Sequence, residues 1–258
     1  MSFSSNLITN EFALNVAVGR YEGALISGRK YAYKASATTT AIDMWGRTHN
    51  LTYATTAETL YLWSDNVTDT AEIELHGLDG NYKYQRATII ANGTTPVAVP
   101  GSWLRVNDFN PSGAVSNIGN IFLSTNAGGV VVDTELRGFI ALGTATDAGI
   151  GGMSHYTVPS GYWAMIKFYN RFAPPGSDVE FIAKYRKGND PFAQADIGGA
   201  WGQVDMGYIP FPPTTDFKIM VRSDSGTINR SLSAAYSIYL IKEEYVNAEF
   251  MHPPVTQL

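Results

Sequence analysis

The stretch Ser231-Leu-Ser-Ala-Ala-Tyr-Ser-Ile-Tyr-Leu-Ile241 alternates larger apolar residues with small ones along its whole length. Successive side chains of a β-strand point to opposite faces, so this pattern predicts a long strand with one buried face. That face would carry Leu232, Ala234, Tyr236, Ile238 and Leu240. No segment before residue 241 shows a helical period of 3.6 residues, and the chain is therefore predicted to be all-β.

Two other runs, 179–186 and 216–222, show the same two-residue period. Shorter strands are predicted at 59–63, 71–75, 84–90, 103–109, 119–123, 130–133, 136–142 and 162–169. Their spacing is typical of a sandwich or barrel. The predicted fold is an antiparallel β-sandwich of jelly-roll type, either as one body or with a smaller β lobe from the first 100 residues.

Three segments are expected along the chain. Residues 1–40 form an extended N-terminal arm with at most two strands, because Phe12, Leu14, Val16 and Val18 alternate with other residues before a Thr-rich stretch. Residues 41–247 form the sandwich, with a suspected sub-boundary near residue 98. Residues 248–258 form a C-terminal tail. A short helix is predicted over Lys242–Phe250, because Pro253-Pro254 stops it early.

Composition narrows the function classes. Charged residues make up 16% of the chain, while it contains 15 Tyr, 12 Phe and 5 Trp, which suggests surface hidden in contacts. The formal net charge is −5 and the longest basic run is Arg29-Lys30, so nucleic acid is not an expected partner. There are no cysteines and no apolar run long enough for a membrane span, so we expect a soluble, unexported chain without disulfides.

Two turns frame the strand predicted at 84–90. Asp79-Gly80 and Asn92-Gly93 are dipeptides that accept a positive φ, so each predicts a tight reversal between strands. A hairpin or meander is therefore expected across 76–97.

Catalytic signatures are missing from the sequence. No nucleophile elbow, phosphate loop or dinucleotide fingerprint is present, and His49, His76, His155 and His252 lie far apart. The missing motifs lower the expectation of an enzyme without removing it, because a fold can bring distant residues together. We predict no catalytic residue and no cofactor, with His76 and Asp79 marking a scaffold turn.

An acidic group is the best candidate for a metal site, because calcium takes several carboxylate oxygens. Its members are Asp65, Asp69, Glu72, Glu74 and Asp79. Glu72 and Glu74 alternate with apolar residues, so the solvated face of a strand explains them more simply, and no metal ligand is predicted.

Aromatic side chains suggest a second hypothesis, a platform on which sugar rings stack. Its members would come from Trp45, Trp63, Trp103, Trp163 and Trp201. Burial in the core or at subunit interfaces is the simpler interpretation, because aromatics dominate both.

The segment 76–97 resembles structural proteins of tailed bacteriophages of marine and aquatic bacteria, which share a Gly-Leu-Asp turn followed by Asn-Gly-Thr-x-Pro-Val. Further matches in the same order are Asp43-Met-Trp45, Ser64-Asp65 with Asp69-Thr70, Arg105-Val106, Asn117-Ile-Gly-Asn-Ile121, His155-Tyr-Thr-Val-Pro-Ser-Gly161 and Thr215-Asp216. The resemblance covers about residues 40–241. These are loose motifs of strand and turn residues, so they indicate a common fold more strongly than a particular role.

The resemblance implies a non-enzymatic virion protein, assembled in the host cytoplasm and placed as capsid decoration or cement. Expected partners are further copies of the chain, a trimer being one option, and the major capsid or other virion proteins. The segment Phe3–Tyr33 is the expected contact arm. A tail or head–tail connector protein and a carbohydrate-binding host-recognition module are the alternatives; glycan hydrolysis would need two carboxylates in a cleft, which no local spacing supports.

Overall fold

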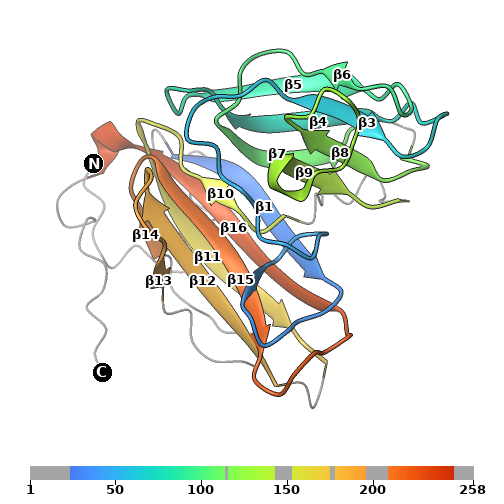
Figure 1. Ribbon diagram of the computed structural model, residues 1–258. Coiled ribbons are helices and arrows are strands. Elements are labelled where there is room, and N and C mark those ends of the chain that lie inside the picture. Colours follow the sequence, from blue (N-terminus) through green and yellow to red (C-terminus); the bar gives the residue numbers. More distant parts are fainter. Residues whose placement is uncertain (1–23, 114–115, 143–152, 175–177, 196–208, 247–258) are drawn as a thin grey trace, which may run out of the picture.

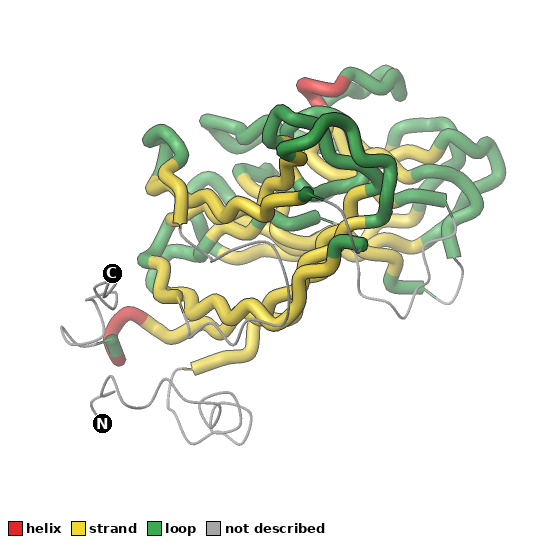
Figure 2. Tube along the Cα trace, turned by 90° about the horizontal axis from the view of Figure 1, so that it is seen from below, coloured by secondary structure: helices red, strands yellow, loops and turns green. Residues whose placement is uncertain are grey.

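The computed structural model describes residues 24–113, 116–142, 153–174, 178–195 and 209–246. These residues form four antiparallel sheets that are grouped into two lobes (Figure 1). Strands and loops make up nearly all of the trace, with short 3-10 turns at η2 (Asp133–Glu135) and η4 (Glu243–Tyr245) (Figure 2). The predicted all-β class with antiparallel pairing is confirmed.

The first lobe, here called the split lobe, is built from strands near both ends of the chain. One of its sheets has the order β1-β16-β11-β14, and the other β10-β15-β12-β13 with β2 also paired to β15. The strands are β1 (Ala24–Lys34), β2 (Ile42–Asp43), β10 (Tyr156–Thr157), β11 (Tyr162–Phe172), β12 (Val179–Lys187), β13 (Ala193–Ala195), β14 (Ile209–Phe211), β15 (Thr215–Ser223) and β16 (Leu232–Lys242).

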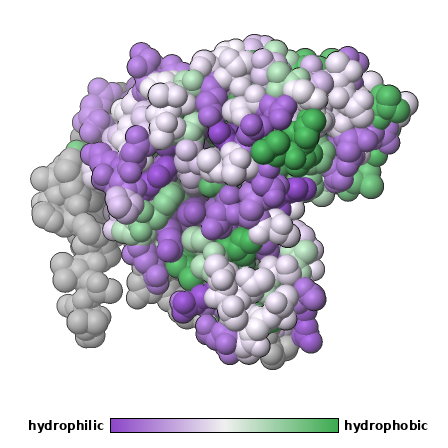
Figure 3. Space-filling view, viewed as in Figure 1, coloured by the Kyte–Doolittle hydropathy of each residue, from purple (hydrophilic) through white to green (hydrophobic). Residues whose placement is uncertain are grey.

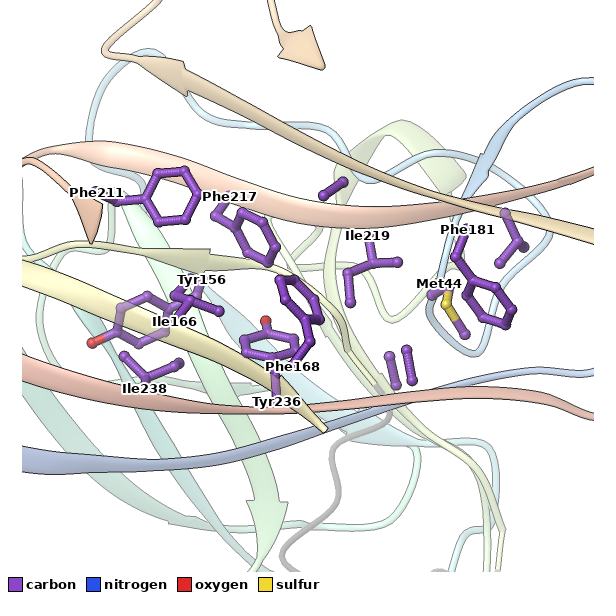
Figure 4. Close-up of a cluster of buried hydrophobic side chains, with 14 of the residues drawn as sticks. Met44, Tyr156, Ile166, Phe168, Phe181, Phe211, Phe217, Ile219, Tyr236 and Ile238 are labelled. Atoms are coloured by element: carbon purple, nitrogen blue, oxygen red, sulfur yellow. The ribbon is translucent and has the colours of Figure 1, made fainter. Parts of the chain in front are cut away.

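The two sheets of the split lobe enclose one hydrophobic core. β16 presents Tyr236 and Ile238 to it, as the alternation of 231–241 predicts, and the facing β15 presents Phe217. The rings of Phe217 and Tyr236 meet edge to face with centroids 5.5 Å apart. Figure 4 shows these side chains interleaved between the ribbons of the two sheets. Apolar burial of this kind is the main force holding the sheets together.

The predicted N-terminal arm needs correction over its described part. β1 pairs with β16 along its length, and Ala32 and Ala37 are fully buried in the core. Ala24–Lys34 is therefore an integral strand, because it completes the edge of a sheet. The rest of the predicted arm and contact segment, residues 1–23, lies outside the described residues, as does the tail 248–258.

The second lobe, here called the inserted lobe, also has two facing sheets. Their orders are β6-β3-β8-β9 and β5-β4-β7. Its core contains Trp103 and Phe109 from one side and Leu62 and Phe122 from the other. The strands are β3 (Tyr61–Ser64), β4 (Glu72–Leu78), β5 (Tyr84–Ile90), β6 (Val97–Ala98), β7 (Arg105–Pro111), β8 (Ile121–Ser124) and β9 (Leu136–Ile140).

The inserted lobe interrupts the split lobe between β2 and β10. Both short strands pair with β15, β2 at Met220 and Val221 and β10 at Asp216 and Phe217. The chain leaves after Met44, which lies in the core of the split lobe, while its neighbour Trp45 lies in the other core. It returns at Ser154, whose N–H donates to the Met44 carbonyl at 3.0 Å. The chain therefore enters and leaves the inserted lobe at one point.

Three finer predictions differ from the structure. The suspected boundary near residue 98 falls inside the inserted lobe, because Ala98 belongs to β6 and pairs with β3. Residues 130–132 are an extended loop rather than a strand, since no neighbouring strand pairs with them. The predicted helix over Lys242–Phe250 contains only a 3-10 turn at Glu243–Tyr245 in its described part.

The two turns predicted around β5 differ in which residue takes a positive φ. The Asn92-Gly93 turn has the predicted positive φ, +56° at Gly93, whereas in the Asp79–Lys83 turn the left-handed residue is Tyr82, with φ 59°. Within the described ranges, no helix has the length and apolar character needed to cross a membrane.

Candidate functional site: the junction between the lobes

A buried polar cluster lies where β7 of the inserted lobe packs on β10 and β15 of the split lobe. Its centre is Asp216, which is fully buried. Arg105 donates from Nε and Nη2 to the two carboxylate oxygens of Asp216 at 2.8 and 3.0 Å. Paired planar contacts of this kind are the strongest and most directional ion pairs in proteins. The pair therefore fixes β7 against β15.

Asp216 also has partners within its own lobe. The hydroxyl of Thr157 donates to one carboxylate oxygen at 2.6 Å, and Nε of Arg186 donates to the other at 2.9 Å. Burial alone would lower the pKa of the Arg105 guanidinium, but its hydrogen bonds to Asp216 and the charge of that carboxylate outweigh burial and raise it. Arg105 is therefore permanently charged.

The guanidinium and ammonium groups of the junction exceed its carboxylates by one. Besides Arg105 and Arg186 facing Asp216, Lys218 pairs with Asp43 at 2.7 Å. Two aromatic faces accept the surplus positive charge, since the faces of aromatic rings attract cations. Tyr53 lies 4.7 Å from the Arg186 guanidinium, and Phe192 lies 4.6 Å from Arg186 and from Lys218. Burial raises the pKa of the Tyr53 hydroxyl well above its usual value.

Backbone groups of the two lobes are joined by side chains. The amide of Asn107 accepts from the Thr157 N–H and donates to the Thr157 carbonyl, both at 2.8 Å. Nε2 of His155 donates to the Val106 carbonyl. Burial lowers the pKa of His155 to about 3, so the ring is neutral at physiological pH. These contacts satisfy polar groups that the lobe contact removes from water.

Two more contacts extend the junction. Nζ of Lys30, on β1, donates to the Asn107 carbonyl and lies 3.4 Å from Asp108. At the other side, the Ser160 N–H donates to the carbonyl of Tyr82 at 2.8 Å. The turn between β4 and β5 thus docks directly on the split lobe.

A small cavity borders this cluster, lined by Tyr53, Leu104, Arg105, Val106 and His155 among others. Its volume is about 20 Å³, enough for a single water and far below the several hundred Å³ of a small-molecule site. The cavity therefore fits a packed joint rather than a substrate pocket.

The acidic group considered for calcium is dispersed in the structure. Glu72 and Glu74 lie on the outer face of β4 and alternate with buried Ile73, as predicted for a strand face. Asp79 accepts from the N–H groups of Asn81 and Lys83 and closes the turn. In the described ranges, no three His, Cys, Asp or Glu side chains are grouped so as to hold a metal ion.

Asp65 and Asp69 have a different role, because their carboxylates accept hydrogen bonds from neighbouring loops. Both oxygens of Asp65 accept from Asn120, at 2.8 and 2.7 Å. Asp69 is buried and accepts from the Ser64 hydroxyl and the Gly119 N–H. Each carboxylate therefore holds neighbouring loops together.

One chain of acid–base groups lies on the open face of the sheet β5-β4-β7. The Tyr84 hydroxyl is 2.6 Å from Nδ1 of His76, whose Nε2 lies 2.9 Å from Glu74. Burial raises the pKa of Tyr84; the charge of Arg86 opposes this effect, and the charge of Glu74 adds a smaller contribution to it. A tyrosine nucleophile needs a lowered pKa, so cross-strand pairing explains the chain better than catalysis. His76 does not pair with Asp79, its neighbour in sequence.

The remaining predicted aromatic and histidine candidates are mostly structural. Trp45, Trp63 and Trp103 are buried in the core of the inserted lobe, while Trp163 is half-buried. Nδ1 of His49 lies 3.2 Å from Asp133. Trp201 and His252 lie outside the described residues. The three buried tryptophans cannot form an exposed sugar platform.

Sequence reasoning missed the junction, although several of its residues belong to the matched motifs. The alternation in 216–222 places Asp216 and Lys218 opposite the core face, which is where they lie. The other lobe covers that face, so both are buried. The sequence feature that could have indicated the junction is the presence of charged residues of both signs on neighbouring strands. The same feature is equally typical of a strand face exposed to water.

Comparisons with protein-family models, curated proteins and solved structures found no match to this chain.

Proposed function

We propose that this protein is a non-enzymatic structural component of a tailed-bacteriophage virion, located on the capsid as a decoration or cement protein. One observation carries the proposal. Motifs that resemble phage structural proteins, Arg105-Val106, His155–Gly161 and Thr215-Asp216, lie far apart in sequence and meet at the buried junction. Their polar groups hold the two lobes together.

A buried joint of this kind suits a structural part. Arg105 pairs with Asp216 and Lys218 pairs with Asp43 inside the molecule, and little room is left for a ligand. Separating the lobes would break the two hydrogen bonds between Arg105 and Asp216, which form only when the lobes meet. A body with fixed geometry can position the surfaces that contact neighbours in a particle.

For the fold, we infer a jelly roll in the split lobe. The sheets β1-β16-β11-β14 and β2-β15-β12-β13 follow the eight-strand order of two interlocked Greek keys, with β2 and β10 as two halves of one interrupted strand. Four antiparallel sheets also occur in a four-bladed propeller, but blades surround one channel, whereas each pair of sheets here encloses its own core.

The proposed partners are further copies of the chain, with a trimer as one arrangement, and the major capsid or other virion proteins. Assembly takes place in the cytoplasm of the host bacterium. The runner-up position within the particle is the tail or the head–tail connector.

Purified particles of the encoding phage test the proposal. Mass spectrometry should detect the chain at a copy number comparable to a capsid protein, and immunogold labelling should decorate the heads. Labelling of tails or of the connector alone would favour the runner-up position. Absence of the chain from particles would refute the virion role.

A carbohydrate-binding role is the second candidate, and one observation favours it. Tyr33 and Phe172 flank Ser233 on the face of the sheet that points away from the core, with Tyr31 on the same face. Tyr31, Tyr33 and Phe172 are 36%, 40% and 50% exposed. A glycan array tests this role, with loss of binding expected in a Tyr33→Ala, Phe172→Ala double variant. Binding that survives the double variant, or no binding by the unmodified protein, would exclude this face as a sugar site.

A further inference from the structure

The free end of the inserted lobe, opposite the junction, exposes apolar side chains. Val67 is 74% exposed, Ile118 is 46% exposed and Leu142 is 62% exposed. They belong to three loops that lie together beyond the ends of β3, β7 and β9, here called the distal tip. In the space-filling view, hydrophobic surface is visible at this end of the molecule (Figure 3). Clustered exposed apolar groups mark interaction sites more often than scattered ones do.

The loops of the distal tip are held in place by hydrogen bonds. Nδ2 of Asn66, next to Val67, donates to the Ile118 carbonyl at 3.2 Å. The Ile118 N–H donates to Asp69, and the Leu142 N–H donates to Oδ1 of Asn120 at 3.0 Å. The apolar side chains are therefore presented on a preorganised surface, which reduces the entropy lost on binding.

The described part of the distal tip has almost no free charge. Its described loops, 64–70, 91–95, 116–120 and 141–142, contain no Lys, Arg or His. The two carboxylates are Asp65, bonded to Asn120, and Asp69, which is buried. The whole chain has a formal net charge of −5, so two copies carry like charges that oppose their association. An uncharged face is where identical surfaces can meet around a rotation axis without facing like charges.

We propose that the distal tip is the surface through which copies of this chain associate with each other. The proposal rests on the proposed function, because it names the face that a self-associating virion protein would use. Val67, Ile118 and Leu142 of one copy pack against the same residues of the next. The Thr and Asn side chains around them supply an uncharged polar rim, as in other protein interfaces.

Sedimentation velocity of the full-length chain tests the proposal across a concentration series. The unmodified protein should sediment as an oligomer. Val67→Asp and Leu142→Asp should each weaken association by at least about tenfold, because a charge would be buried in the contact. Tyr185→Asp is the matched control, since it places the same charge at an exposed aromatic side chain of the other lobe and should leave the oligomer unchanged. Unchanged far-UV circular dichroism would show that the variants fold.

The distal-tip interface and the virion role can fail independently. A folded Val67→Asp, Leu142→Asp double variant that sediments like the unmodified protein would overturn the distal tip as the interface. So would a control that dissociates as strongly as the tip variants, or an unmodified chain that is monomeric at all concentrations. Detection of that chain on phage heads would still leave the virion role in place.

Discussion

Asp216 is a fully buried carboxylate whose partners come from both lobes. Transfer of a carboxylate out of water costs several kcal/mol, and here two guanidinium groups and a hydroxyl replace its hydration. A buried ion pair adds little net stability compared with an apolar pair of the same shape. Its value at this position is directional, because the planar contact with Arg105 is made only when the lobes meet at one angle.

Arg105→Met should destabilise the protein strongly, because Asp216 would keep only one of its two guanidinium partners. We expect the free energy of unfolding to fall by about 3 kcal/mol, measured by urea denaturation. Arg222→Met is the control. Arg222 lies on β15, the strand of Asp216, and the variant removes a more exposed ion pair with Glu180, so it should cost less than about 1 kcal/mol. Equal losses in the two variants would contradict a special role of the junction.

His155 should make the stability of the protein depend on pH. Burial, followed by the charge of Lys30, lowers its pKa from 6.5 to about 3 against the opposing hydrogen bond to Val106. Between these pH values the unfolded chain binds more protons than the folded chain, so the stability present above pH 6.5 is lost as the pH falls. We expect this residue to account for about 3 kcal/mol of loss between pH 7 and pH 4.

His155→Gln separates that contribution from other titrating groups. The Gln amide can still donate to the Val106 carbonyl but does not titrate. Urea unfolding at several pH values should give a shallower acid loss for the variant. Parallel curves would show that His155 is not the responsible group.

A β-bulge is the element that orients the junction. The register between β4 and β7 shifts at His76 and Gly77, which leaves Asn107 as the extra residue of β7. Bulges redirect side chains, and here the redirected amide reaches Thr157 of the other lobe. Gly77 permits the close approach, because a β-carbon at this position would lie 2.1 Å from the Arg105 carbonyl oxygen.

Gly77→Ala should therefore displace β7 and with it Arg105. Crowding of this kind costs about 1–3 kcal/mol, and loss of the Arg105 contact adds to it. Gly80→Ala lies in the following turn, where the new β-carbon would meet Ala57 at an ordinary 3.4 Å, and should change stability by less than about 1 kcal/mol. The difference between the two urea midpoints measures the effect, and similar midpoints would contradict it.

At the scale of the molecule, β15 pairs with both short strands that flank the insertion into the split lobe. β2 and β10 lie along the same edge of β15, so the inserted lobe leaves and returns through neighbouring residues. Insertions tolerated in this way have a core of their own, and the inserted lobe has one around Trp103, Phe109 and Leu123.

Residues 45–153 should therefore fold when expressed alone. We expect a cooperative thermal transition in far-UV circular dichroism, because this core needs no residue of the split lobe. The midpoint should be lower than in the full chain, since Arg105 and Asn107 lose their partners there. A broad transition without cooperativity would show that the two lobes fold only together.

The local pattern of the sequence accounts for much of the secondary structure. Alternation predicts β16 and its buried face, and the dipeptides Asp79-Gly80 and Asn92-Gly93 predict the turns around β5 at their observed places. Such patterns report the environment of a residue relative to its neighbours. They contain no information on which strands pair across the fold or which lobe covers a given face. The lobe boundary suspected near residue 98 is therefore wrong, because β6 pairs with β3 within one lobe.

The sequence by itself determined the all-β class, the periods of the long strands and the position of the main turns, because these depend on neighbours a few residues apart. Only the tertiary structure decided that β2 and β10 share one edge, that Val67 and Leu142 are displayed at one tip, and that Arg105 meets Asp216. That last pair is separated by 111 residues. Its contact depends on how the two lobes pack, and local alternation cannot distinguish a strand face exposed to water from one covered by another lobe.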